Sequence, residues 1–148
     1  MHASPMSASG HIEIDDSHWP VLILRYPEDS APGQYAAMLA RRSLYFERRE
    51  VHVVVHDMTR SNVSGSSDNR RLQMDWLKRE EARIREWNLG TAFIINSAPL
   101  RVLLSVMLHL RPLAVPHLVV PRLAEARPWV ETQLRQAGLP VPPLDDLR

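Results

Sequence analysis

The stretch VHVVVHDMTRSNVSGSSDNRR, residues 51–71, decides the fold. Its first five residues have the density of β-branched side chains that is typical of a strand covered on both faces. Residues 56–71 then lose this apolar character, and these 16 residues carry five Ser or Thr and one Gly. In open α/β sheets, binding sites collect in loops at the carboxyl ends of parallel strands, because helix N-termini present free N–H groups there. We therefore expect a functional site in this loop.

The rest of the chain divides into helices and strands by its apolar periodicity and its turn residues. Strands are expected at residues 11–15, 21–26, 51–55, 91–96 and 116–120. Helices are expected at residues 34–47, 69–88, 98–110 and 122–138. Ser67 or Asp68 is placed to cap the second helix, Gly90 suits its C-terminal end, and Pro128 interrupts or kinks the last. This order predicts an α/β fold whose mixed five-stranded sheet has an N-terminal hairpin, then parallel β-α units, with about four helices.

Composition limits the class of protein. The 148 residues suit one domain, expected at 11–138, between a disordered tail at 1–10 and an extended, proline-rich tail at 139–148. A formal net charge of +1 lacks the basic bias of a nucleic-acid-binding protein. The absence of Cys excludes disulfides and fits a reducing cytoplasm. No apolar run reaches the roughly 20 residues that span a bilayer, so we expect a soluble, cytoplasmic protein without an integral membrane segment.

Three short stretches carry a family resemblance. They are Asp57-Met58-Thr59 at a strand end, GTAFIINSAPLR at residues 90–101, and the Ala-x-x-Trp of residues 126–129. Together with the element order, they resemble the STAS domain, in particular the SpoIIAA-like (STAS/SEC14-type) bacterial proteins, over roughly residues 11–137. The resemblance implies a signalling module that binds protein partners, or a sensor of small ligands or lipids, more readily than an enzyme.

The resemblance also implies a position for a phosphorylatable serine. In antagonist STAS domains, this serine lies nine residues after the strand-end Asp, and counting from Asp57 leads to Ser66. The flanking residues differ, because Gly65 and Asp68 stand where the family has Asp and Gly.

The loop itself offers hydroxyl and amide groups around a predicted helix N-terminus. Such groups could hold an anion or a phosphoserine, whose negative charge the helix dipole would favour, or bind a partner. The candidate residues are Asp57, Thr59, Asn62, Ser64, Ser66 and Ser67. The alternative is that Ser67 or Asp68 simply caps the helix and that the rest of the loop is solvated.

The helix expected at residues 98–110 is apolar around most of its circumference. A helix on a sheet needs only one apolar stripe, so its second face requires an explanation. That face is buried within the domain, covered by a protein partner or a second copy of the chain, or lines a pocket for an apolar small molecule. The candidate residues are Val102, Leu103, Val106, Met107 and Leu110.

The arginines and acids on two of the predicted helices can be explained by structure alone. Arg41, Arg42 and Arg48 fall at or beyond the later turns of the helix at 34–47, where cations suit the helix dipole. Arginines and interleaved acids on the helix at 69–88 predict a solvated face or a docking surface for an acidic partner, and exclude nucleic acid because the charges cancel.

Catalytic and metal chemistry finds little support. His52, His56 and His117 could bind zinc, but no carboxylate stands at the expected spacing, and they fit better as strand residues. A serine hydrolase built from Ser64 or Ser66 with His56 and Asp57 would lack the G-x-S-x-G elbow.

We therefore predict no catalytic residue, no metal and no cofactor. The primary hypothesis is a non-enzymatic regulatory interaction module that binds protein partners, with a homodimer as one form. The alternative is a carrier or sensor of a small apolar or lipid ligand, whose pocket lies beneath the helix at residues 98–110. A serine-based hydrolase is the third hypothesis.

Overall fold

The computed structural model describes residues 10–61 and 67–147. Within these ranges the chain forms five strands and five helices. The strands are β1 (Glu13–His18), β2 (Val21–Arg25), β3 (His52–Asp57), β4 (Asn88–Ile94) and β5 (His117–Val120). The helices are α2 (Gln34–Phe46), α3 (Ser67–Arg79), α4 (Glu81–Trp87), α5 (Ala98–Leu110) and α6 (Leu123–Gln136). The predicted α/β class is confirmed, while the tail predicted to be disordered lies outside the described residues except for Gly10.

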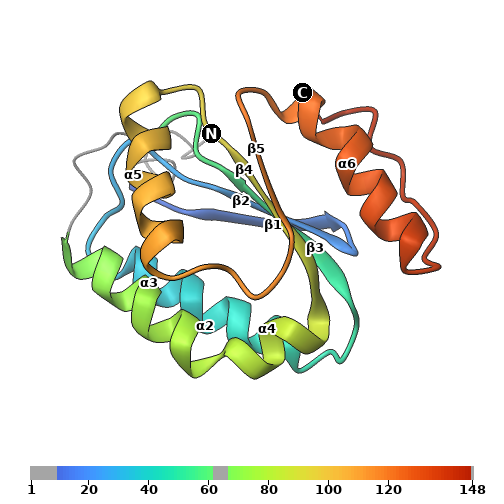
Figure 1. Cartoon of the computed structure of the whole chain (residues 1–148), viewed down its shortest axis with the longest axis horizontal. Coiled ribbons are helices and arrows are strands. Elements are labelled where there is room, and N and C mark those ends of the chain that lie inside the picture. The colour runs from blue at the N-terminus through green and yellow to red at the C-terminus, as the bar shows by residue number, and fades with distance from the viewer. Residues whose placement is uncertain (1–9, 62–66, 148) are drawn as a thin grey trace, which may run out of the picture.

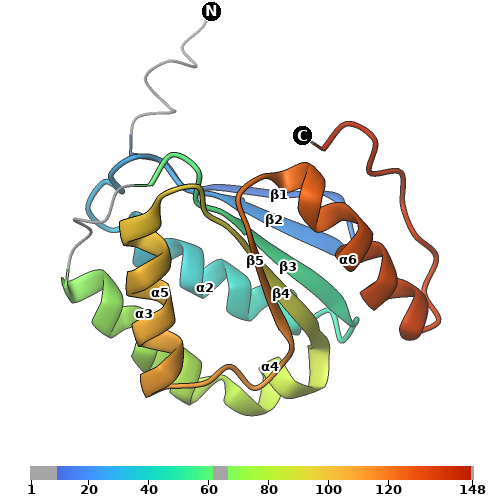
Figure 2. The same ribbon diagram turned by 45° about the horizontal axis from the view of Figure 1, so that its top comes forward.

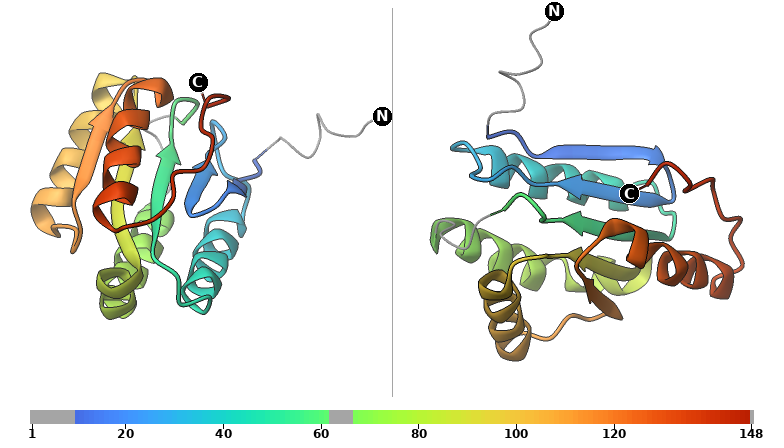
Figure 3. Two further views of the ribbon diagram at one scale, coloured as in Figure 1. Left: turned by 90° about the vertical axis from the view of Figure 1, so that its right-hand side faces the viewer. Right: turned by 90° about the horizontal axis from the view of Figure 1, so that it is seen from above.

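The sheet is mixed, as predicted, and its strands follow the order of the chain. β1 pairs antiparallel with β2, and β2, β3, β4 and β5 are parallel neighbours. Because the parallel strands are added in one direction, right-handed crossovers place α2, α3, α4 and α5 on the same face. Helix α6 follows the last strand and lies on the opposite face (Figures 1 and 3). β3 was expected to be covered on both faces, which is confirmed, and it is the central strand of the sheet.

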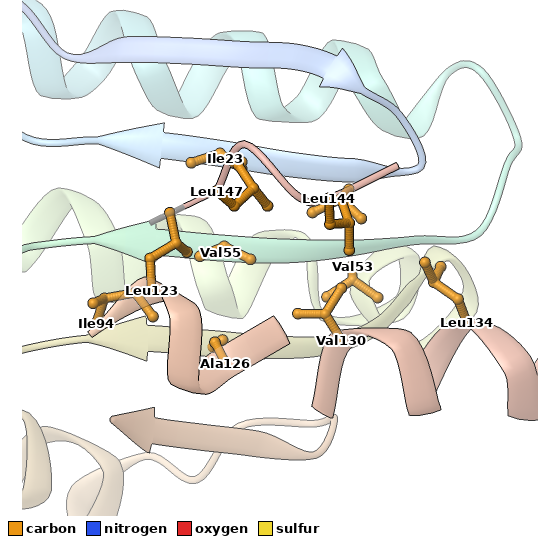
Figure 4. Packing of buried hydrophobic residues seen from close by; sticks show 12 residues of the cluster. Ile23, Val53, Val55, Ile94, Leu123, Ala126, Val130, Leu134, Leu144 and Leu147 are labelled. Carbon is orange, nitrogen blue, oxygen red and sulfur yellow. The ribbon is translucent and has the colours of Figure 1, made fainter. Parts of the chain in front are cut away.

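The face beneath α6 is an aliphatic core. Alternate residues of the three central strands point toward α6, and all of them are 0% exposed: Val21, Ile23, Val53, Val55, Ala92 and Ile94. Leu123, Ala126, Val130 and Leu134 of α6 pack on them (Figure 4). Pro128 lies inside α6, which continues through it as one helix. This face therefore has the dense packing expected of a domain core.

The proline-rich tail is part of this core. Leu144 and Leu147 are buried against the sheet, and Figure 4 shows Leu147 beside Ile23. Arg127 donates a hydrogen bond from Nη2 to the carbonyl oxygen of Leu147 at 2.6 Å. The two leucines fix the tail to the domain, and a turn at residues 145–146 lies between them.

The helix predicted at residues 69–88 is two helices, and this accounts for five helices instead of about four. Helix α3 ends at Arg79, Glu80 separates it from α4, and β4 begins at Asn88. Gly90 consequently lies within β4 and caps no helix. A Cβ atom at Gly90 would approach Cη2 of Trp129 to 2.8 Å, so the glycine lets α6 pack closely on the sheet.

The opposite face carries the remaining helices. Met38, Leu39, Phe46, Trp76 and Ile84, from α2, α3 and α4, pack on Leu22, Leu24 and Val54 of the sheet. Helix α5 lies beside α3 on this face (Figures 1 and 2). Leu100 is its one buried residue, so α5 rests on the sheet mainly by its first turn. None of the described helices is both long enough and apolar enough to cross a membrane.

Candidate functional site

A pocket of about 320 Å³ opens at the carboxyl ends of β2, β3 and β4, between α3 and α5. The α5 wall consists of Leu100, Leu103, Leu104 and Met107. The pocket exists because α5 contacts the sheet near its N-terminus and leaves space beneath its later turns. Ser97 fixes that end, since its Oγ accepts a hydrogen bond from the backbone N–H of Leu100 at 3.4 Å.

Aromatic side chains from the ends of three adjacent strands form the floor. The ring of His56 stacks on Phe93 with centroids 5.1 Å apart and on Tyr26 with centroids 5.8 Å apart. Nδ1 of His56 and the hydroxyl of Tyr26 are hydrogen-bonded at 2.8 Å. Burial lowers the pKa of His56 well below its usual value and raises the pKa of Tyr26 well above its own. Both side chains are therefore neutral at physiological pH.

The pocket wall opposite α5 is formed by residues of α2 and α3. Tyr35 donates a hydrogen bond from its hydroxyl to Oε1 of Gln73 at 2.7 Å. Burial raises the pKa of Tyr35 to about 12, so this phenol also stays protonated. Asn69 and Arg70 of α3 continue the wall, and residues 27–30 after β2 form the rim.

Arg42 is buried close to this site. The sequence predicted only that it lies in the later turns of the helix, where a cation suits the helix dipole, and gave no sign that its side chain is only 4% exposed. Its guanidinium carbon lies 4.4 Å from the ring centroid of Trp76. Nη1 of Arg42 is buried without a hydrogen-bond partner in the described structure. Its positive charge adds to the lowering of the pKa of His56 and opposes the rise in the pKa of Tyr26 and Tyr35, as expected of a cation on the inner side of the pocket.

The candidate residues of α5 divide between its two faces. Leu103 and Met107 line the pocket, as the ligand hypothesis requires. Val102, Val106 and Leu110 face solvent with exposed fractions of 64%, 51% and 74%. Burial of the whole helix within the domain, one of the three interpretations of its sequence, is therefore wrong.

The candidate loop residues are only partly described. Oδ1 of Asp57 accepts hydrogen bonds from the backbone N–H of Thr59 at 3.1 Å and from its hydroxyl at 2.7 Å. Both residues line a smaller cavity, of about 110 Å³, that shares Tyr26 with the main pocket. Ser67 is exposed and is the first residue of α3, with Asp68 in its first turn. Asn62, Ser64 and Ser66 lie outside the described residues.

The zinc hypothesis has no geometric support. Nδ1 of His52 is hydrogen-bonded to the carbonyl oxygen of Glu50 at 3.0 Å, and its ring stacks on Trp19. Burial lowers the pKa of His52 to about 4. His117 is exposed on β5, on another part of the sheet. Among the described residues, no group of three potential ligands could hold a metal ion.

The hydrolase hypothesis is not supported by the described part of its triad either. His56 is hydrogen-bonded to Tyr26, while Asp57 binds Thr59, so these two members do not orient each other. The serines that would complete the triad, Ser64 and Ser66, are outside the described residues.

Comparisons with protein-family models, with curated proteins and with solved structures gave no match to this chain. The STAS resemblance therefore stays a prediction based on its three short motifs.

Proposed function

We propose that this protein is a non-enzymatic carrier or sensor that binds a small apolar molecule in the pocket between α3 and α5. The observation that supports the proposal is the inner face of α5, which borders an open pocket where a helix of this composition would ordinarily be packed. The pocket volume of about 320 Å³ lies at the lower end of the range for small-molecule sites.

The composition of the walls suits an apolar ligand. Leu103, Leu104 and Met107 are each partly exposed in the pocket, and Phe93 provides an aromatic surface that also lines it. An eight-carbon chain that buries roughly 250 Å² of its own apolar surface there would gain about 6 kcal/mol, before the entropic cost of binding. Methionine adds a flexible, polarisable contact that adjusts to ligand shape.

A neutral fluorescent probe, N-phenyl-1-naphthylamine, tests the proposal by titration of the full-length chain. Leu104→Arg places a long charged side chain on the pocket wall and should weaken probe binding at least tenfold. Val106→Arg makes the same change on the solvent face of α5 and is the matched control, which should bind like the wild type. Equal binding by all three proteins, or binding by none, would reject the proposal.

A regulatory protein-interaction module is the second candidate, and the outer face of α5 favours it. Val102, Val106 and Leu110 lie one helical turn apart in sequence and are more than half exposed. Large apolar side chains in such a row are typical of a surface covered by another chain. Sedimentation velocity over a range of concentrations should then show a dimer that Val106→Arg dissociates and Leu104→Arg retains. A monomer at every concentration would exclude self-association.

A further inference from the structure

At the floor of the pocket, one hydrogen-bond donor is not used by the bond between Tyr26 and His56. Tyr26 and a neutral His56 together carry two polar hydrogens, one on the phenol and one on the imidazole. One of these hydrogens is used in the bond between the Tyr26 oxygen and Nδ1 of His56. If Tyr26 donates, the imidazole hydrogen is on Nε2; if His56 donates, the phenolic hydrogen is left over. In both tautomers one donor has no acceptor within the described structure.

A buried positive charge lies next to the same floor. Arg42 forms no ion pair with any described residue, and its Nη1 has no hydrogen-bond partner. Its contact with the face of Trp76 offsets only part of the cost of burying a cation. Arg42 is only 4% exposed and does not line the pocket, so its charge would act on a ligand across Tyr26, Tyr35 and His56 without direct contact.

The acids near the pocket do not neutralise Arg42. Glu28 and Asp29 are exposed on the rim, where water and salt screen their charges. Arg70 also lines the pocket, from the α3 side. A buried charge is screened far less than exposed ones, so the positive potential of Arg42 dominates at the floor.

We propose that the ligand is an amphipathic carboxylic acid, held with its carboxylate at the Tyr26–His56 pair and its apolar body along Leu103, Leu104 and Met107. This proposal rests on the proposed function and specifies its ligand class. A carboxylate accepts the unused hydrogen in a charge-assisted bond and supplies the negative charge that Arg42 lacks. A neutral molecule of the same shape would leave the buried cation uncompensated.

Titration calorimetry with octanoate and octan-1-ol at pH 7.5 tests the proposal, because the two probes share a chain length and differ in charge. Octanoate should bind wild-type protein roughly tenfold more tightly than octan-1-ol, which corresponds to 1.4 kcal/mol. Arg42→Met removes the charge while keeping an apolar side chain over Trp76, and should abolish the preference by weakening octanoate alone. Arg41→Met, its exposed neighbour, should keep the preference.

The outcomes separate this proposal from the proposed function. Octan-1-ol binding that equals or exceeds octanoate binding would overturn the acid assignment and leave the apolar pocket in place. A preference for octanoate that survives Arg42→Met would overturn the role of the buried cation. Binding of neither probe, with no response of N-phenyl-1-naphthylamine, would overturn both proposals. If Arg42→Met fails to fold, the wild-type comparison decides alone.

Discussion

The two faces of the sheet are built from alternate residues of the same three strands, yet they differ in composition and in packing. The α6 face presents Val, Ile and Ala, covered by α6 and by the C-terminal tail. On the other face, β3 contributes His52 and His56 beside Val54, and β4 contributes Phe93. This second face encloses a cationic side chain, two buried imidazoles and an open pocket.

The difference assigns a separate task to each face. On the α6 face, the described aliphatic residues form one buried cluster. Burial of this apolar surface stabilises the fold. The α5 face includes polar groups that cost free energy to bury, which a protein keeps where they serve a site. Mutations on the α6 face should therefore mainly lower the free energy of unfolding. Mutations on the α5 face should mainly weaken ligand binding.

The largest contrast is expected between Leu134→Ala and Leu104→Ala. Leu134 is 0% exposed beneath α6, and its truncation should lower the free energy of unfolding by about 2–5 kcal/mol without changing probe affinity. Leu104 lines the pocket, so the corresponding change should lower the free energy of unfolding by about 1 kcal/mol or less, because few protein contacts are lost. It should nevertheless weaken probe binding. Urea unfolding measures the stability loss and probe titration measures the affinity. Equal losses of stability in the two variants would contradict the division of roles between the two faces.

Gly90→Ala tests how closely α6 approaches the sheet. The new methyl group would meet Trp129 at 2.8 Å, so we expect a loss of about 1–3 kcal/mol in unfolding free energy. In a Trp129→Leu background the same substitution should cost markedly less, since the opposing ring is gone. Equal costs in the two backgrounds would show that Trp129 is not the reason for glycine.

The buried imidazoles predict a pH dependence specific to the α5 face. His52 has a pKa of about 4 in the folded protein against about 6.5 in the unfolded chain, so the unfolded chain binds more protons between these values. Stability should therefore fall as the pH drops below 6.5, by about 2 kcal/mol from His52 alone between pH 7 and pH 5. His56 acts in the same direction.

His52→Gln removes the titrating group and should reduce that loss by about 2 kcal/mol, whatever its effect at pH 7. Urea unfolding of both proteins at pH 7 and pH 5 measures the difference. An unchanged loss between the two pH values would contradict the assignment to His52.

The smallest effect is expected on the outer face of α5. Val106→Ser should change the unfolding free energy of the monomer by no more than about 0.5 kcal/mol, because the side chain already faces solvent. Thermal unfolding at low protein concentration measures this. A larger loss would mean that Val106 is covered in solution, and would favour the interaction module over the carrier.

The sequence predicted the parts of the fold that local patterns determine. The β-branched run of β3 predicted a strand covered on both faces, and the apolar pattern predicted α5 with its observed bounds. Gly90 was misassigned as the end of a helix. Glycine is needed there because Trp129, 39 residues away, packs against it, and no local pattern reveals this contact. The break at Glu80 was missed for a similar reason, since its carboxylate binds Ser43 of α2 and Arg83 of α4.

The site was harder to predict than the fold. The apolar circumference of α5 raised a ligand pocket as one of three alternatives, and a pocket does lie beneath part of this helix. Tyr26, Tyr35 and Phe93 were missed because they come from three different elements that only the folded chain brings together. Arg42 was missed because its position in the later turns of α2 was already explained by the helix dipole. The available signal was its place one turn after Met38 and Leu39, on the apolar stripe of that helix.

Methyl NMR of the full-length chain with increasing octan-1-ol tests the separation of the two faces most directly. We expect saturable shifts at the methyl groups of Leu103, Leu104 and Met107, while those of Val130 and Leu134 stay unchanged. Shifts confined to Val102, Val106 and Leu110, or spread equally over both faces of the sheet, would contradict this separation.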